Sequence, residues 1–169
     1  MMKTIRLLIG NKDRRTAQLI ESLVRDVCRE HAVVTAQKTG CVDELLYWGC
    51  TEDFDLIIFT PDNLTAQPNY ITSTLNRLRQ AQRAARAIRT ERATHMIATG
   101  VPPEYEMPLL EAGVDSVLPQ PFSCEELKSA VRNALNFYVA PELQPVEQLS
   151  FGQVFQRGFR RLTEATGLF

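Results

Sequence analysis

The sequence predicts an α/β fold in which one sheet of parallel strands carries helices on both faces. Short runs rich in branched apolar residues alternate along the chain with longer amphipathic segments. Such alternation is typical of a parallel sheet whose strands are joined by crossover helices. In addition, 44% of the 169 residues are hydrophobic, which is enough to form the core of one domain of ordinary size.

Five short strands are expected, and the runs TIRLLIG and DLIIFT among them are nearly all apolar, as in strands buried on both faces. Five β/α units within residues 1–138 fit a flavodoxin-like doubly wound sheet with strand order 2-1-3-4-5. The predicted strands lie at 4–10, 32–36, 55–60, 94–100 and within 115–122.

The segments between the strands show helical patterns. In segment 13–30 the apolar residues from Ile20 to Val27 recur at the spacing of one helix face. Ser123 and Glu126 have the S-x-x-E spacing of a capping box and predict the start of the last helix of this domain. The remaining helices are expected at 42–50, 69–91 and 104–113, the last of them ended by a glycine.

Residues 139–169 depart from this alternation and predict a C-terminal helical extension. Segment 139–149 contains two prolines and is expected to be an extended linker. Segment 150–169 is expected to form an amphipathic helix, which would dock on its own domain, on a second copy or another protein, or on a membrane surface. Its short length and two glycines disfavour the membrane. The candidate partner-binding residues are Phe151, Phe155, Phe159 and Leu162.

Composition and charge exclude several classes of protein. The net charge of -1 predicts neither a dedicated nucleic-acid binder nor an acidic tail, and no apolar stretch approaches the roughly 20 residues that span a bilayer. Two histidines and four cysteines without a C-x-x-C pair predict no metal site and no cofactor. We expect reduced, mostly buried thiols in a cytoplasmic protein, with a Cys41–Cys50 disulfide or redox pair as the alternative.

The segment LEAGVDSVLPQPFSCEEL, residues 110–127, carries the most specific motif. It resembles the end of a response-regulator receiver domain, which typically reads L-x-x-G-A-x-D-Y-L-x-K-P-F-x-x-x-E-L. The upstream strands occur in matching order, so that the resemblance covers roughly residues 3–138. In that family an acidic pair after the first strand binds Mg²⁺, and an aspartate ending the third strand accepts a phosphoryl group. A hydroxyl residue ending the fourth strand and a lysine after the fifth bind that group and, with the cation, offset the carboxylate charges.

This sequence differs from the family at nearly every one of those positions. Gly10 and Asn11 stand in place of the acidic pair, and Thr60 stands in place of the acceptor. Gln120 replaces the lysine, and only Thr99 matches. The resemblance therefore implies a receiver fold without phosphotransfer chemistry, with a degenerate pocket whose polar groups can satisfy one another through hydrogen bonds or water.

Three further features bear on this pocket. Pro121 matches the family pattern, and a cis bond between Gln120 and Pro121 is expected from the resemblance. Val117 replaces the aromatic residue that follows the switch in receivers. Asp62, two residues beyond Thr60, is the alternative phosphoacceptor, although the shift would move the carboxylate by about 6–7 Å.

The expected helix at 69–91 carries many arginines, and its apolar stripe leaves a basic face that includes Arg79, Arg83 and Arg86. This face is either simply solvated or binds an anionic partner. A protein fits better than a nucleic acid, because the helix has no aromatic residue for base stacking.

These observations predict a non-catalytic, receiver-like signalling or scaffolding module that acts through protein contacts in a two-component or phosphorelay context, independently of phosphorylation. By resemblance, two copies are expected to pair through the fourth helix, fifth strand and fifth helix. The alternatives are a small-ligand or anion sensor that uses the degenerate pocket, and a response regulator phosphorylated on Asp62.

Overall fold

Five parallel strands form one sheet in the order β2-β1-β3-β4-β5, as the sequence predicts. The computed structural model describes residues 3–61, 73, 75–77, 79–80 and 94–136. The strands are β1 (Lys3–Gly10), β2 (Ala32–Thr39), β3 (Leu56–Phe59), β4 (His95–Val101) and β5 (Ser116–Pro119).

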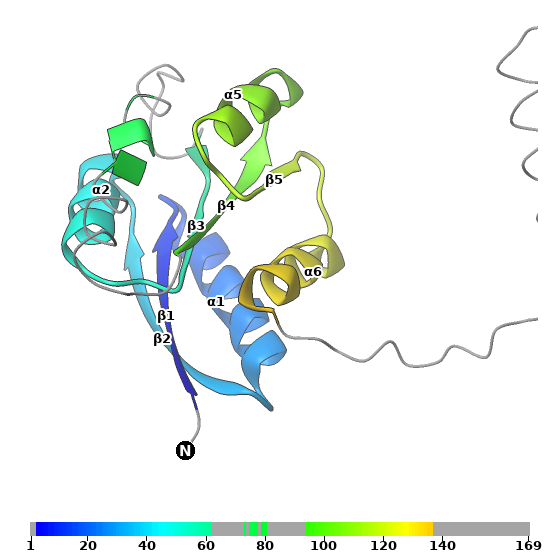
Figure 1. The fold of residues 1–169 in the computed structure, drawn as a ribbon. Helices are drawn as coiled ribbons and strands as arrows, with labels where there is room; N and C mark the ends of the chain where they lie inside the picture. The colour runs from blue at the N-terminus through cyan, green and yellow to red at the C-terminus, as the bar shows by residue number, and fades with distance from the viewer. Residues whose placement is uncertain (1–2, 62–72, 74, 78, 81–93, 137–169) are drawn as a thin grey trace, which may run out of the picture. The chain divides into compact units, whose positions relative to one another are not determined.

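Helices cover both faces of this sheet (Figure 1). Helices α1 and α6 pack on one face, and α2 and α5 lie on the other. Within the segment expected to be helical at 69–91, the described residues 73, 75–77 and 79–80 are helical, and Leu75 is buried as its apolar stripe predicts. The bounds are α1 (Arg14–Cys28), α2 (Val42–Thr51), the 3₁₀ turn η1 (Pro103–Tyr105), α5 (Glu106–Glu111) and α6 (Cys124–Leu135).

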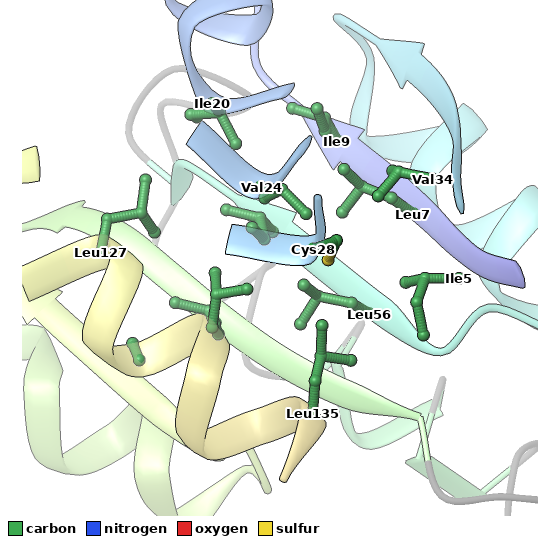
Figure 2. Packing of buried hydrophobic residues seen from close by; sticks show 14 of the residues in the cluster. Ile5, Leu7, Ile9, Ile20, Val24, Cys28, Val34, Leu56, Leu127 and Leu135 are labelled. Atoms are coloured by element: carbon green, nitrogen blue, oxygen red, sulfur yellow. The ribbon is translucent and has the colours of Figure 1, made fainter. Parts of the chain in front are cut away.

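One hydrophobic core joins α1 and α6 to the sheet (Figure 2). Ile20 and Val24 of α1 and Leu127 of α6 are at most 3% exposed and pack with alternate residues of β1 and β3, among them Leu7 and Leu56. Full burial of one such side chain stabilises the fold by about 1.5–3 kcal/mol. This layer therefore holds the central strands rigidly.

A second core lies on the opposite face of the sheet. Leu8 of β1 and Ile57 and Phe59 of β3 are almost fully buried there, together with Leu45 of α2 and Leu109 of α5. Because β1 and β3 are buried on both faces, their carboxyl ends are fixed points from which polar side chains can be positioned.

The helix ends follow the local sequence. Asp13 caps α1 by accepting hydrogen bonds from the backbone N–H groups of Arg15 and Thr16. Ser123 and Glu126 form the predicted capping box of α6. Beyond α5, Gly113 has a φ of +98°, a left-handed conformation that glycine adopts without steric cost, so this predicted glycine cap is confirmed.

Two predicted elements differ from those observed. β2 continues three residues beyond the predicted 32–36, because it pairs with β1 along its whole length and the pairing outweighs the polar character of its last residues. The helix predicted at 104–113 is divided into η1 and the shorter α5. Proline lies in the first turn of η1, a position where the missing N–H is tolerated.

The prediction of mostly buried thiols is wrong. Only Cys28 is buried, whereas Cys41, Cys50 and Cys124 are exposed, and all four are free. Cys41 is the N-cap residue of α2 and Cys50 lies near the other end of this helix, so that most of the length of α2 separates the two residues. Among the described residues, none of the helices combines the length and the apolar character that crossing a membrane requires.

Candidate functional site

The carboxyl ends of β1, β3 and β4 bring three of the predicted pocket residues into one hydrogen-bonded row. The side-chain amide of Asn11 donates to the hydroxyl of Thr60 over 3.0 Å. The hydroxyls of Thr60 and Thr99 lie 2.9 Å apart. We call Asn11, Thr60 and Thr99 the polar ladder. Its members are adjacent because their strands are adjacent in the sheet, although 49 and 39 residues of chain separate the paired side chains.

The ladder has a consistent donor direction from β1 toward β4. Thr99 has the carbonyl oxygen of Phe59 as an acceptor at 3.4 Å, so Thr60 is left to donate to Thr99 and to accept from Asn11. At the other end, the side-chain oxygen of Asn11 accepts from the backbone N–H of Asp13 over 2.8 Å. Each hydroxyl thus donates once and accepts once, as buried polar groups require.

Burial makes the ladder structurally important. Asn11 is 4% exposed and Thr99 is 1% exposed, whereas Thr60 is half-buried. An unpartnered polar group at such depth costs about 1–3 kcal/mol, so the mutual pairing removes a substantial penalty. The predicted satisfaction of the pocket's polar groups by one another is confirmed for these three residues.

Gly10 and Gln120 contribute differently. The carbonyl of Gly10 accepts from the backbone N–H of Thr60 over 2.9 Å, which ties the ends of β1 and β3 together. Gln120 lies against Gly100, where an added Cβ would stand 3.1 Å from the amide nitrogen of Gln120. The side chain of Gln120 is exposed to solvent. The peptide bond between Gln120 and Pro121 is cis, as the resemblance implies.

The ladder contains no ionisable group. Asp13 is the first carboxylate after β1, and it is committed to capping α1. Hydrogen bonds from the hydroxyl and N–H of Thr16 hold the pKa of Asp13 below its usual value, so this group stays ionised at the helix end. Within the described part of the chain, no group of three His, Cys, Asp or Glu side chains is arranged to hold a metal ion.

Arg79 does not belong to an open basic face, contrary to the prediction. Its side chain is only 13% exposed. Its guanidinium donates to the carbonyl oxygens of Gly113 and Thr94 and pairs with the carboxylate of Asp115 over 2.9 Å. This arginine therefore joins the helical segment around residue 79 to the start of β4 and to the loop before β5.

The remaining candidate residues lie outside the described residues. They are Asp62, Arg83, Arg86, Phe151, Phe155, Phe159 and Leu162.

Sequence reasoning missed a hollow on the β2 side of the ladder. This hollow has a volume of about 510 Å³ and lies between the β1–α1 loop, the end of β2 and the start of α2. Lys12 and Glu44 are among its lining residues. No motif marks the hollow, because residues from three separate segments form it. The signal in the sequence was the pair of basic residues Lys12 and Arg14, two positions apart.

The comparison with solved structures supports the fold. No family model and no curated protein matches this sequence. A receiver domain of a Francisella response regulator is 21% identical to this chain, with a TM-score of 0.59; the match covers 79% of this chain and 98% of that one. The receiver domain of a sensor histidine kinase from Pseudomonas aeruginosa, in whose structure a magnesium ion is coordinated in the active-site cleft, is 13% identical, with a TM-score of 0.57 and coverage of 79% and 98%.

A pilus assembly-related protein from Burkholderia pseudomallei is also similar in structure. It is 18% identical, with a TM-score of 0.59, and the match covers 78% of this chain and 90% of that one. At these identities the likeness is one of fold. Residues 3–136, so far as they are described, therefore have the flavodoxin-like fold of response-regulator receiver domains.

Proposed function

We propose that this chain is a non-catalytic receiver-like module that acts through protein contacts in a two-component type of signalling system, without being phosphorylated. The observation that carries the proposal is the polar ladder. Where receivers need carboxylates, a cation and a lysine, Asn11, Thr60 and Thr99 are neutral and bond to one another. A phosphoryl group placed there would meet no counter-charge from the ladder.

The structural neighbours support the signalling context. Receiver domains from a response regulator and from a sensor histidine kinase have the same fold, and so does a pilus assembly-related protein. Because a fold hosts many functions, the ladder and not the likeness argues against phosphotransfer in this chain. We place the protein in the cytoplasm, where such modules meet their partners.

Beryllofluoride with Mg²⁺ tests the proposal, because it mimics an aspartyl phosphate. Amide NMR spectra of the full-length protein are expected to change little around Thr60 and Thr99 when both are added. A matched variant, Asp62→Asn, distinguishes the main alternative. Strong shifts in the natural protein that vanish in Asp62→Asn would establish a response regulator phosphorylated on Asp62. Strong shifts that persist in this variant would place an anion in the degenerate pocket.

Two surfaces are proposed for protein contacts. Met107 and Leu110 of α5 are 62% and 38% exposed, which supports pairing of two copies through α5, β5 and α6. The second is the apolar face expected on segment 150–169. Light scattering of the full-length chain tests the first surface, because Met107→Lys is expected to lower the mass of a homodimer. Replacing Phe151, Phe155 and Phe159 by serine is expected to abolish partner capture without unfolding residues 3–136.

A further inference from the structure

The hollow beside the polar ladder has the position and size of a small-molecule site. It lies at the carboxyl ends of β1 and β2, on the edge of the sheet where open parallel sheets bind ligands and one strand away from the switch point between β1 and β3. Its volume of about 510 Å³ falls within the range of roughly 300–1,000 Å³ that is common for such sites. In Figure 1 this is the edge from which the chain enters α1 and α2.

Buried side chains form the floor of the hollow and keep its shape. Asn11, Ala17 and Thr39 are each at most 5% exposed. The backbone N–H of Asn11 donates to the carbonyl of Thr39 over 2.9 Å, which ties together the two strand ends. Ala17 of α1 has only a methyl group as its side chain, so α1 does not fill the hollow at this position.

The walls of the hollow carry charges of both signs. Lys12 and Arg14 are exposed, and neither forms an ion pair with another described residue. Lys38 also lines the hollow, but it already forms an ion pair with Glu21 over 2.5 Å. We therefore do not count its charge among those that bind the ligand. The N–H groups of Arg15 and Thr16 at the start of α1 are capped by Asp13, so the attraction for an anion comes from the two side chains.

Glu44 gives the hollow a fixed hydrogen-bond acceptor. The hydroxyl of Thr39 donates to one carboxylate oxygen of Glu44 over 2.6 Å. Thr39 is itself held by the backbone N–H of Cys41. The carboxylate is therefore oriented by the protein, and its second oxygen can accept from a ligand hydroxyl.

We propose that this hollow binds a small phosphorylated molecule that also carries sugar hydroxyl groups. Lys12 and the planar guanidinium of Arg14 bind the phosphate, and Glu44 accepts from a ribose hydroxyl. An acidic side chain after the second strand has this role toward ribose in dinucleotide-binding folds. The inference does not rest on the proposed function, since the side chain of Asn11 stays bonded to Thr60 and to the N–H of Asp13 when the hollow is occupied.

An NMR titration of the full-length protein tests this inference with three probes: inorganic phosphate, ribose 5-phosphate and AMP. Ribose 5-phosphate and AMP are expected to produce saturable shifts of the amides of Lys12, Gly40 and Glu44, and inorganic phosphate weaker ones. The paired change Lys12→Gln and Arg14→Gln is expected to weaken binding of all three probes by at least about tenfold. If AMP binds saturably and ribose 5-phosphate does not bind, the result would also support the site and would identify a nucleotide as its ligand.

Two single variants separate specific recognition from general charge. Glu44→Gln is expected to weaken the binding of ribose 5-phosphate, because the acceptor for its hydroxyl is lost, but not the binding of inorganic phosphate, because the carboxylate can only repel that anion. Arg15→Gln removes a neighbouring exposed arginine of the same helix that does not line the hollow, and it should bind like the natural protein. Unchanged melting temperatures would show that all these exposed substitutions leave the fold intact.

Three results would overturn the inference. One is the absence of saturable shifts with every probe at millimolar concentration. Another is an equal loss of affinity in Arg15→Gln and in the paired variant, which would mean that only net charge matters. The third is a set of shifts centred on Thr60 and Thr99, which would place the anion in the ladder instead.

Discussion

Replacing the two threonines of the polar ladder by valine separates its hydrogen bonds from its packing. Valine has nearly the volume of threonine and favours β-structure, so Thr60→Val and Thr99→Val remove hydroxyl groups without opening a cavity. Thr60 contacts a ladder partner on each side, the amide of Asn11 and the hydroxyl of Thr99. Thr99 has one ladder partner and a longer contact with a carbonyl.

This asymmetry sets the expected magnitudes. Thr60→Val removes two hydrogen bonds at once, one to the 4%-exposed Asn11 and one to the hydroxyl of Thr99, so we expect a loss of about 2–3 kcal/mol in the free energy of unfolding. Thr99→Val leaves only the half-buried hydroxyl of Thr60, which can turn toward water, and should cost about 1 kcal/mol. Both single changes break the same bond. The double variant should therefore lose about 1 kcal/mol less than the two losses added.

Urea unfolding of the four proteins measures this cycle, and Thr35→Val is the matched control. Thr35 lies on β2 with an exposed side chain, so its exchange should change the free energy of unfolding by no more than about 0.5 kcal/mol. Additive losses at positions 60 and 99, within about 0.3–0.5 kcal/mol, would refute the ladder as a coupled unit. A larger loss for Thr99→Val than for Thr60→Val would refute the placing of Thr60 between two ladder partners.

Three other expectations follow from the described contacts. Gly113→Ala should lower the free energy of unfolding by more than the left-handed penalty of about 1–2 kcal/mol, because the added Cβ would also stand 3.1 Å from the guanidinium Nε of Arg79. Thermal unfolding should show a clearly lower melting temperature for this variant and little change for the control Gly40→Ala. Hydrogen bonding and attraction from Lys38 lower the pKa of Glu21. Stability should therefore fall as the pH drops below about 4.3, and acid titration of Glu21→Gln should show a shallower fall. Burial raises the pKa of Cys28 to about 11, so a thiol reagent at neutral pH should modify only the three exposed thiols of the folded protein: Cys41, Cys50 and Cys124.

The fold could be predicted from sequence because its signals are local. The apolar body of β3, the helical spacing in α1 and the capping box at Ser123 each depend on residues within one element. The end of β2 was predicted too early for the opposite reason. Its last residues are polar, and only their pairing with β1 makes them a strand.

The candidate site was predictable only where strand order alone decides proximity. Once the order 2-1-3-4-5 is assumed, the residues at the carboxyl ends of β1, β3 and β4 must lie side by side, and the ladder is expected from this. The prediction for Arg79 was wrong because helical periodicity indicates only which face of the helix a residue occupies. It cannot show that the carbonyl groups of Gly113 and Thr94 lie within hydrogen-bond distance of that face. The hollow was missed because its shape depends on the small side chains of Ala17 and Gly40. Neither residue stands out in the sequence, and the three segments that line the hollow come together only in the folded chain.

The ladder also explains why the charged residues of a receiver site would have to be absent together. A single carboxylate at position 60 would be flanked by the amide of Asn11 and the hydroxyl of Thr99, with no cation among the ladder residues. Its desolvation at this partly buried edge would be only partly offset by hydrogen bonds. Conversely, a lysine at position 120 would face no carboxylate of the ladder. Neutral side chains at all of these positions remove each of those costs at once, and the strand ends are then held together by the hydrogen bonds that bridge them. This arrangement stabilises the sheet edge without any bound ion, and it leaves the outer surfaces of the domain to carry the proposed contacts.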